Sequence, residues 1–203
     1  MDAQLAAGPD GGARIGPNAI IRIAEALAEL SPAHRTPVFA AAGLEHYLEH
    51  LPERMVPEAD VSALQAAVGE HLPPALADSI NQRAGQLTAD YLLANRIPRA
   101  VQHLLKPLPA GLAARVLLGA IARHAWTFAG SGTFHAAPIR RGAQVSIVGC
   151  PVCAGRHLDH PACGYFTATF AGLFVSLVHP HSRVRETACQ AMGDPACRFD
   201  IRW

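Results

Sequence analysis

Residues 184–201 read VRETACQAMGDPACRFDI, and this segment predicts the architecture of the C-terminal region. The Gly-Asp-Pro turn at 193–195 places Cys189 and Cys197 on the two arms of a hairpin. After the turn, residues 197–202 alternate between apolar and polar side chains, which is the pattern of a strand with one buried face. The chain therefore ends in an antiparallel hairpin whose arms bring two cysteines together.

Upstream of this hairpin, proline and glycine residues divide the chain into successive helices. The first begins at Pro17, because proline fits the first helical turn and apolar residues then recur on one face. Further helices are expected at residues 36–50, 57–71, 74–95, 98–105 and 110–126. In the last of these, an i, i+4 ladder of apolar residues, Leu112, Val116 and Ala120, leads to His124.

The second half of the chain predicts strands and one aromatic helix. Strands are expected at 134–139 and 143–148, joined by an Arg-Arg-Gly turn, and a helix opens at Cys163. The fold class is therefore α+β, with a helical N-terminal half followed by an antiparallel sheet covered on one face by helices. Residues 1–13 are expected to form a disordered tail, 14–130 the helical region and 131–203 the α+β region, within one compact domain of 203 residues.

Composition excludes several classes of function. The net charge is +1 with interspersed signs, so no basic stripe favours nucleic acid binding. No apolar run approaches the roughly 20 residues of a membrane span, and the N-terminus lacks the order of a secretion signal. Five cysteines are an odd number and do not indicate a disulfide framework. We expect a cytoplasmic protein without a transmembrane segment.

Three cysteines and one glutamate form a candidate metal site. Cys163, Glu186, Cys189 and Cys197 supply the sulfur and oxygen donors that a tetrahedral zinc ion accepts. Four protein ligands leave no open position for water, so such a zinc ion would be structural. In a regular strand, Glu186 and Cys189 point to opposite faces, so a bulge or a strand end near Thr187 is required.

A second candidate set lies just upstream. Cys150, Cys153, His157, His160 and Cys163 form a CxxC motif with trailing histidines, which can also bind zinc. Cys150 and Cys153 can instead be a redox pair, a ligand contact, or two small buried side chains in a turn. The sequence alone leaves these interpretations open.

The spacing of Cys163, Glu186, Cys189 and Cys197 resembles that of the 4-vinyl reductase domain family, which also supplies the sensor modules of bacterial phenol-responsive regulators. The segment RIGPNAI at residues 14–20 supports the same resemblance. The resemblance implies a structural zinc on those four residues. It also implies a fold shared with trafficking-complex subunits and haem–nitric oxide sensor domains, which commonly form homodimers through helices. Over the whole chain, the resemblance is closest to members that act in bacteriochlorophyll biosynthesis and photosynthesis, so a place at the periphery of photosynthetic membranes is also expected.

The resemblance to bacteriochlorophyll proteins implies a tetrapyrrole ligand, either a magnesium porphyrin or protoporphyrin. A flat apolar slot with one nitrogen donor suits such a ligand. The expected slot lies between the Cys163 helix and the sheet, and its candidate residues are His124, Trp126, Phe166, Phe170 and Phe174. The same residues also suit a purely structural role in an apolar core.

The resemblance leaves three functions open. The first is a carrier that presents a porphyrin to pathway enzymes, such as the magnesium chelatase or a later enzyme. The second is a reductase for the 8-vinyl group of divinyl protochlorophyllide or chlorophyllide, and the third is a sensor module for a small aromatic compound. The sequence contains no GxGxxG motif after a strand and no phosphate loop, which favours binding over catalysis.

Overall fold

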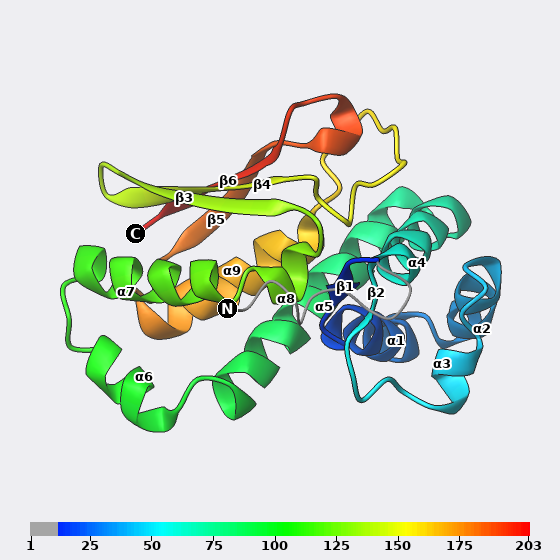
Figure 1. Ribbon diagram of the computed structural model, residues 1–203, viewed down its shortest axis with the longest axis horizontal. Helices are drawn as coiled ribbons and strands as arrows, with labels where there is room; N and C mark the ends of the chain where they lie inside the picture. The colour runs from blue at the N-terminus through cyan, green and yellow to red at the C-terminus, as the bar shows by residue number, and fades with distance from the viewer. Residues whose placement is uncertain (1–11) are drawn as a thin grey trace.

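The computed structural model describes residues 12–203 (Figure 1). The helices are α1 (Asn18–Leu30), α2 (Pro32–Ala41), α3 (His46–Glu49), α4 (Glu58–His71), α5 (Pro74–Asn95), α6 (Arg99–Leu105), α7 (Ala110–Arg123), α8 (Trp126–Ala129) and α9 (Gly164–Leu177). The strands are β1 (Arg14–Ile15), β2 (Val56–Pro57), β3 (Thr133–Ile139), β4 (Gly142–Val148), β5 (Arg183–Ala188) and β6 (Cys197–Arg202). Most of the expected tail, residues 1–11, lies outside the described residues.

Strands β3 to β6 form one antiparallel sheet in the order β3-β4-β6-β5. In the centre of the sheet, Val145 of β4 pairs with Phe199 of β6. Both strands alternate between buried and more exposed residues, so one face of the sheet is covered and the other meets solvent. The predicted α+β class and the final hairpin are confirmed.

Helix α9 covers the inner face of the sheet and lies in turn against α5 (Figure 1). The two helices approach closely because α5 has Gly85 at the crossing point. A Cβ atom on Gly85 would lie 2.3 Å from the Tyr165 carbonyl oxygen. The Thr169 hydroxyl uses the same opening and donates to the Gly85 carbonyl oxygen at 3.2 Å. Gly85 is therefore a close-contact residue rather than a weak point of the helix.

The RIGPNAI segment joins the N-terminus to the rest of the core. β1 pairs with β2, and the Gly16 amide donates to the Thr127 carbonyl oxygen beside α8 at 2.7 Å. The helix that follows buries Ile20, Ile23 and Leu27, as its apolar period predicts.

Two helix predictions were wrong in detail. The helix expected at 36–50 is divided into α2 and α3, because Gly43 has a positive φ of 70° and ends α2. The helix expected at 110–126 ends at Arg123, and its apolar ladder faces solvent: Leu112 is 46% exposed and Val116 is 47% exposed. The buried face of α7 instead consists of Ala113, Ala114, Leu117 and Leu118.

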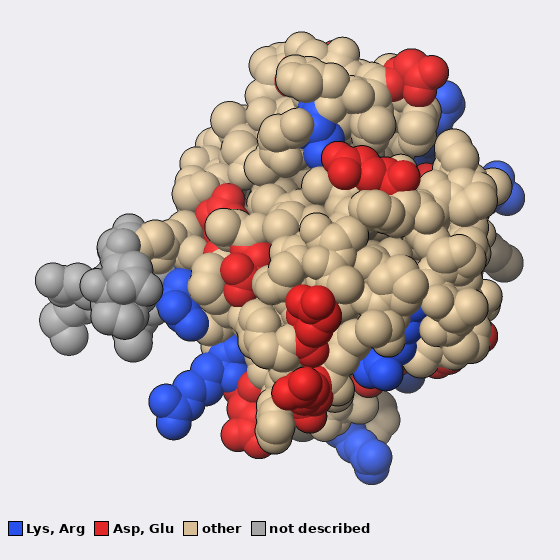
Figure 2. All heavy atoms as spheres, turned by 90° about the vertical axis from the view of Figure 1, so that its right-hand side faces the viewer, with Lys and Arg blue, Asp and Glu red and all other residues tan. Residues whose placement is uncertain are grey.

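The described surface shows no strong charge segregation on the face that carries α2 and α4. Acidic and basic side chains are interspersed there among uncharged residues (Figure 2). No helix among residues 12–203 has both the length and the apolar character that crossing a bilayer requires.

Candidate metal centre

All five cysteines are buried beside one end of the sheet. Cys150 and Cys153 lie in the turns that follow β4, and Cys163 is the N-cap residue of α9. Cys189 follows β5, and Cys197 begins β6. Each cysteine therefore stands where a regular element ends or begins, and the fold brings these ends together.

The hairpin between β5 and β6 orients its two cysteines through a local turn. A short 3₁₀ turn (Gln190–Met192) follows Cys189, and Gly193 then takes a left-handed conformation with φ 94°. The Cys189 amide donates to the Asp194 carboxylate at 2.8 Å, which closes the turn. The predicted turn at 193–195 thus returns Cys197 toward Cys189.

The strand conflict between Glu186 and Cys189 is resolved by a bulge. Glu186 pairs with Phe199 and Ala188 pairs with Arg198, so Thr187 has no partner on β6. The irregularity lies where the sequence required it, and it turns Glu186 toward the same side as Cys189. This prediction is confirmed.

Four sulfur atoms form a compact group around Cys153. The Cys153 Sγ lies 3.3 Å from Cys163 Sγ, 3.5 Å from Cys189 Sγ and 3.4 Å from Cys197 Sγ. The Cys163 and Cys197 sulfurs are 3.4 Å apart. These separations are too long for a disulfide, whose S–S bond is about 2.05 Å. They are close to the edge of about 3.8 Å that four Zn–S bonds of about 2.3 Å define in a tetrahedron.

The buried cysteines can hold a metal ion in more than one combination. The predicted set converges: one donor atom from each of Cys163, Glu186, Cys189 and Cys197 lies within 4.8 Å of the others. A four-cysteine combination of Cys150, Cys153, Cys163 and Cys197 meets the same distance. No sequence pattern joined Cys153 to Cys189 and Cys197; the CxxC motif was the available signal for it.

The histidines of the second candidate set do not join the cluster. His157 is exposed, and His160 Nδ1 lies 2.7 Å from the Asp159 carboxylate, to which it is adjacent in the chain. Only the cysteines of that set converge.

Glu186 provides a direct test of whether the site suits a cation. Its Oε2 accepts a hydrogen bond from the Cys163 amide at 2.9 Å, whereas its Oε1 is buried and has no hydrogen-bond partner among the described residues. Burial, followed by the nearby Cys189 sulfur, raises the pKa of Glu186 to about 8. An unpaired buried carboxylate oxygen is costly, and a bound cation would remove this cost. The donor set therefore fits a metal ion.

The thiols depend on one another for their ionisation. Hydrogen bonds from Cys150 and then from the other thiols hold the pKa of Cys153 well below its usual range. The same network, again led by Cys150, raises the pKa of Cys163 and of Cys197. Several thiolates together therefore require a compensating positive charge, which a divalent ion supplies.

Backbone amides, rather than arginines, lie against the sulfurs. Ala162 N donates to Cys189 Sγ, and Gln190 N donates to Cys197 Sγ, each at 3.4 Å. The side chains of Arg183, Arg185 and Arg198 are exposed instead. Amide donors at sulfur orient ligands and stabilise their negative charge, and the N-terminus of α9 adds a favourable dipole at Cys163.

The residues predicted to bind a ligand occupy separate environments. His124 is exposed at the C-terminal end of α7, and Trp126 is half-buried in α8. Phe166, Phe170 and Phe174 are buried in the core, where Phe170 packs against Phe199 with ring centroids 5.5 Å apart. The three rings are therefore covered by protein side chains, and their ligand-binding role stays a prediction.

The fold and this cysteine-rich site define the C-terminal part of the chain as a 4-vinyl reductase domain: the model of that domain family matches residues 143–203. Two curated relatives extend the match to nearly the whole chain. The "Bacteriochlorophyll synthase 23 kDa chain" of Cereibacter sphaeroides is 45% identical and covers 98% of this chain and 96% of its own length. That of Rhodobacter capsulatus is 34% identical and covers 98% and 92%. The chain belongs to the family of bacteriochlorophyll synthase 23 kDa chains.

Solved structures share the fold at low sequence identity. An H-NOX protein from S. oneidensis in the Fe(II) ligation state matches with a TM-score of 0.50 and 10% identity, covering 93% of this chain and 95% of that one. A trafficking protein particle complex subunit 3 from Naegleria fowleri, covalently bound to palmitic acid, gives a TM-score of 0.48 and 11% identity, covering 70% and 93%. The likeness to the H-NOX protein concerns the fold alone.

Proposed function

We propose that this chain is an accessory protein of bacteriochlorophyll biosynthesis that binds a porphyrin intermediate and presents it to pathway enzymes. The observation that carries the proposal is the similarity, over nearly the full length, to two bacteriochlorophyll synthase 23 kDa chains. Magnesium chelatase or a later enzyme of the pathway is the proposed recipient. A homodimer is the proposed assembly, and light scattering of the purified chain measures it.

The metal centre has a structural role in this proposal. We assign zinc to Cys163, Glu186, Cys189 and Cys197, since the unpaired Glu186 oxygen supplies the oxygen donor of the set. Bound there, the ion would tie the β5–β6 hairpin to the start of α9. Four protein ligands leave no position for a substrate, which supports a structural rather than a catalytic ion.

Binding without catalysis is favoured by the placement of the glycines. Reduction of a vinyl group requires a bound source of hydride or electrons. A phosphate-binding element for a dinucleotide normally has glycines before a helix N-terminus, but Gly130 and Gly132 precede β3. This arrangement supports a carrier over a reductase.

Titration of the purified full-length chain with magnesium protoporphyrin and with protoporphyrin tests the proposal. We expect saturable absorbance changes with a Kd of micromolar or tighter, on the order of −8 kcal/mol. Zinc analysis of the same sample should give about one ion per chain. Absence of saturable binding to a folded, metal-loaded chain would overturn the carrier role.

A further inference from the structure

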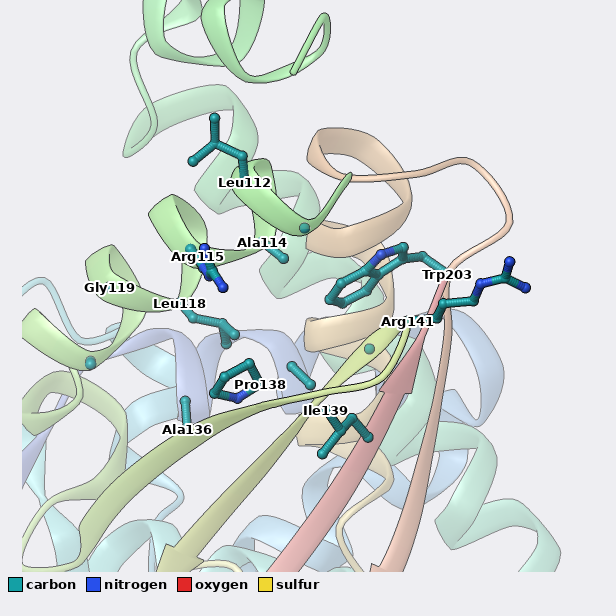
Figure 3. A pocket seen from close by; sticks show the side chains of 14 residues that line it. Leu112, Ala114, Arg115, Leu118, Gly119, Ala136, Pro138, Ile139, Arg141 and Trp203 are labelled. Carbon is teal, nitrogen blue, oxygen red and sulfur yellow. The ribbon is translucent and has the colours of Figure 1, made fainter. Parts of the chain in front are cut away.

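A cavity of about 560 Å³ lies between α7 and the β3–β4 hairpin (Figure 3). Its volume falls within the roughly 300–1,000 Å³ typical of sites for small organic molecules. It is separate from the cysteine cluster and is not lined by His124, Trp126 or the buried phenylalanines of α9. Trp203, which follows β6, projects between the helix and the hairpin (Figure 3).

The cavity exists because small residues meet on its two walls. Phe134, Ala136 and Pro138 share one face of β3, since side chains alternate along a strand. Phe134 fills the core and contacts Phe128, with ring centroids 5.7 Å apart. Further along the strand, Ala136 and Pro138 are exposed although they line the space beside α7. The apolar layer under the sheet therefore continues into the cavity, where no described side chain fills it.

Two arginines lie at the edges of this apolar space. Arg115 comes from α7, and Arg141 comes from the turn between β3 and β4; both are exposed. Within residues 12–203, neither guanidinium lies within ion-pair distance of a carboxylate. No acidic residue lines the cavity in the described chain. The cavity is thus apolar inside and positive at its edges, which suits a ligand with an apolar body and carboxylate groups.

The backbone at Arg141 is a second and independent observation. Arg141 has φ 52°, and it is the one residue other than glycine with positive φ in the described chain. Glycine or asparagine is the usual choice at such a position, and an arginine there is unusual. The turn is held by the end of β6, because Trp203 N donates to the Arg141 carbonyl oxygen at 3.4 Å and Arg202 donates to that of Arg140 at 2.9 Å. The chain therefore keeps a positive side chain at a costly position beside the cavity.

We propose that this cavity is the porphyrin site, an inference that rests on the proposed function. The macrocycle lies between the walls formed by Ala114, Leu118 and Pro138, with Trp203 available for stacking. The carboxylates of the porphyrin side chains bind Arg115 and Arg141. No histidine, cysteine or carboxylate lines the cavity within the described residues, so no side chain ligates a central magnesium ion. Magnesium and metal-free porphyrins therefore bind with affinities within about tenfold of one another, since one ligand bond of this kind is not made.

Fluorescence titration with protoporphyrin tests the arginines. Arg115→Gln and Arg141→Gly should each weaken binding about tenfold, the loss of one charge-assisted hydrogen bond. The glycine also suits the positive φ at 141, so this variant should fold at least as well as the wild type. Arg123→Gln is the matched control, because Arg123 is an exposed arginine on α7 that does not line the cavity. Its affinity should equal that of the wild type.

Two further arms separate charge recognition from occupation of the cavity. The dimethyl ester of protoporphyrin lacks free carboxylates, so the wild type should bind it more weakly than the diacid, while the double arginine variant should not distinguish them. Gly119→Phe should block the cavity, because a Cβ atom on Gly119 meets no other atom within 4 Å and the ring has space to enter. We expect this variant to remain folded and to lose porphyrin binding more than tenfold.

The outcomes distinguish this inference from the proposed function. If the wild type binds porphyrin and the Arg115, Arg141 and Gly119 variants bind it equally well, the site lies elsewhere while the carrier role stands. If binding falls in the Arg123 control as much as in the Arg115 variant, general surface charge rather than this cavity is responsible, and the assignment is wrong. If the folded wild type binds no porphyrin, the proposed function fails and the assignment fails with it.

Discussion

The clearest perturbation of the metal centre compares Glu186→Gln with Cys153→Ser. Both side chains lie within the cluster, but only Glu186 belongs to the proposed zinc set. Glutamine keeps the size of glutamate, and its carbonyl oxygen can still accept the Cys163 amide. The charge and the second carboxylate oxygen are lost. We expect Glu186→Gln to weaken zinc binding and Cys153→Ser to retain it.

The magnitude follows from the role of each atom. Changes outside the ligand set of a metal site typically cost about 10–100-fold in affinity, so the loss of a ligand should cost at least about 100-fold. This corresponds to about 2.7 kcal/mol. Because structural metal binding is coupled to folding, the same loss should appear in the free energy of unfolding of the zinc-loaded protein. Cys153→Ser should change the zinc affinity by less than about tenfold.

Competition with a chromophoric zinc chelator measures both affinities, and denaturant unfolding of the same samples measures stability. Addition of a strong chelator to the wild type should lower stability by several kcal/mol, as expected for a folding-coupled ion. If Cys153→Ser releases the zinc while Glu186→Gln holds it, the fourth ligand is a thiolate and the assignment of Glu186 is wrong.

Two further predictions concern the contact between α5 and α9. Gly85→Ala should lower the free energy of unfolding by about 1–3 kcal/mol, because its Cβ would lie 2.3 Å from a backbone oxygen. Gly119→Ala, where the new Cβ meets nothing, should instead raise it by up to about 1 kcal/mol, and equal effects in denaturant melts would contradict the close-contact role. Burial raises the pKa of Tyr165 to about 12, so its hydroxyl, which bonds Thr88 at 2.8 Å, should contribute stability below pH 10 that is lost as the pH rises from 10 to 12. Tyr165→Phe should remove up to about 1.4 kcal/mol of that loss per pH unit, and identical pH profiles above pH 10 would refute the assignment.

Much of the C-terminal half could be predicted because local signals and tertiary packing agree there. The alternation at 197–202 and the turn at 193–195 both specify the final hairpin, and the structure confirms each. The bulge at Thr187 was predicted from the need to turn Glu186 and Cys189 to one side. Patterns with one solution, such as a strand that must bury one face, are readable from sequence.

The helical half was less predictable because periodicity does not specify which face is buried. In α7 the large residues Leu112 and Val116 face solvent, whereas the small residues Ala113 and Ala114 are buried. Small residues allow close packing, and this preference is set by neighbouring elements rather than by the helix itself. The same limitation hid the cavity, since its walls consist of residues with little local signal.

The proximity of Cys153 to the cluster also could not be predicted. The segment between β4 and α9 contains turns without regular structure, so no periodicity relates Cys153 to Cys189 or Cys197. The hydrogen bond from the Cys150 amide to the Gln190 side chain, at 2.6 Å, ties this segment to the hairpin turn. A long-range contact of that kind appears only in the folded structure.

The central claim, that the chain binds its porphyrin without transforming it, is tested most directly by one incubation. The purified, zinc-loaded chain is mixed with divinyl protochlorophyllide and NADPH, and the pigment is recovered and analysed by mass spectrometry. We predict a shifted absorbance spectrum of the bound pigment and recovery of divinyl pigment with an unchanged mass. A gain of two hydrogen atoms on the recovered pigment, in proportion to the NADPH consumed, would contradict the carrier role and establish the chain as a vinyl reductase.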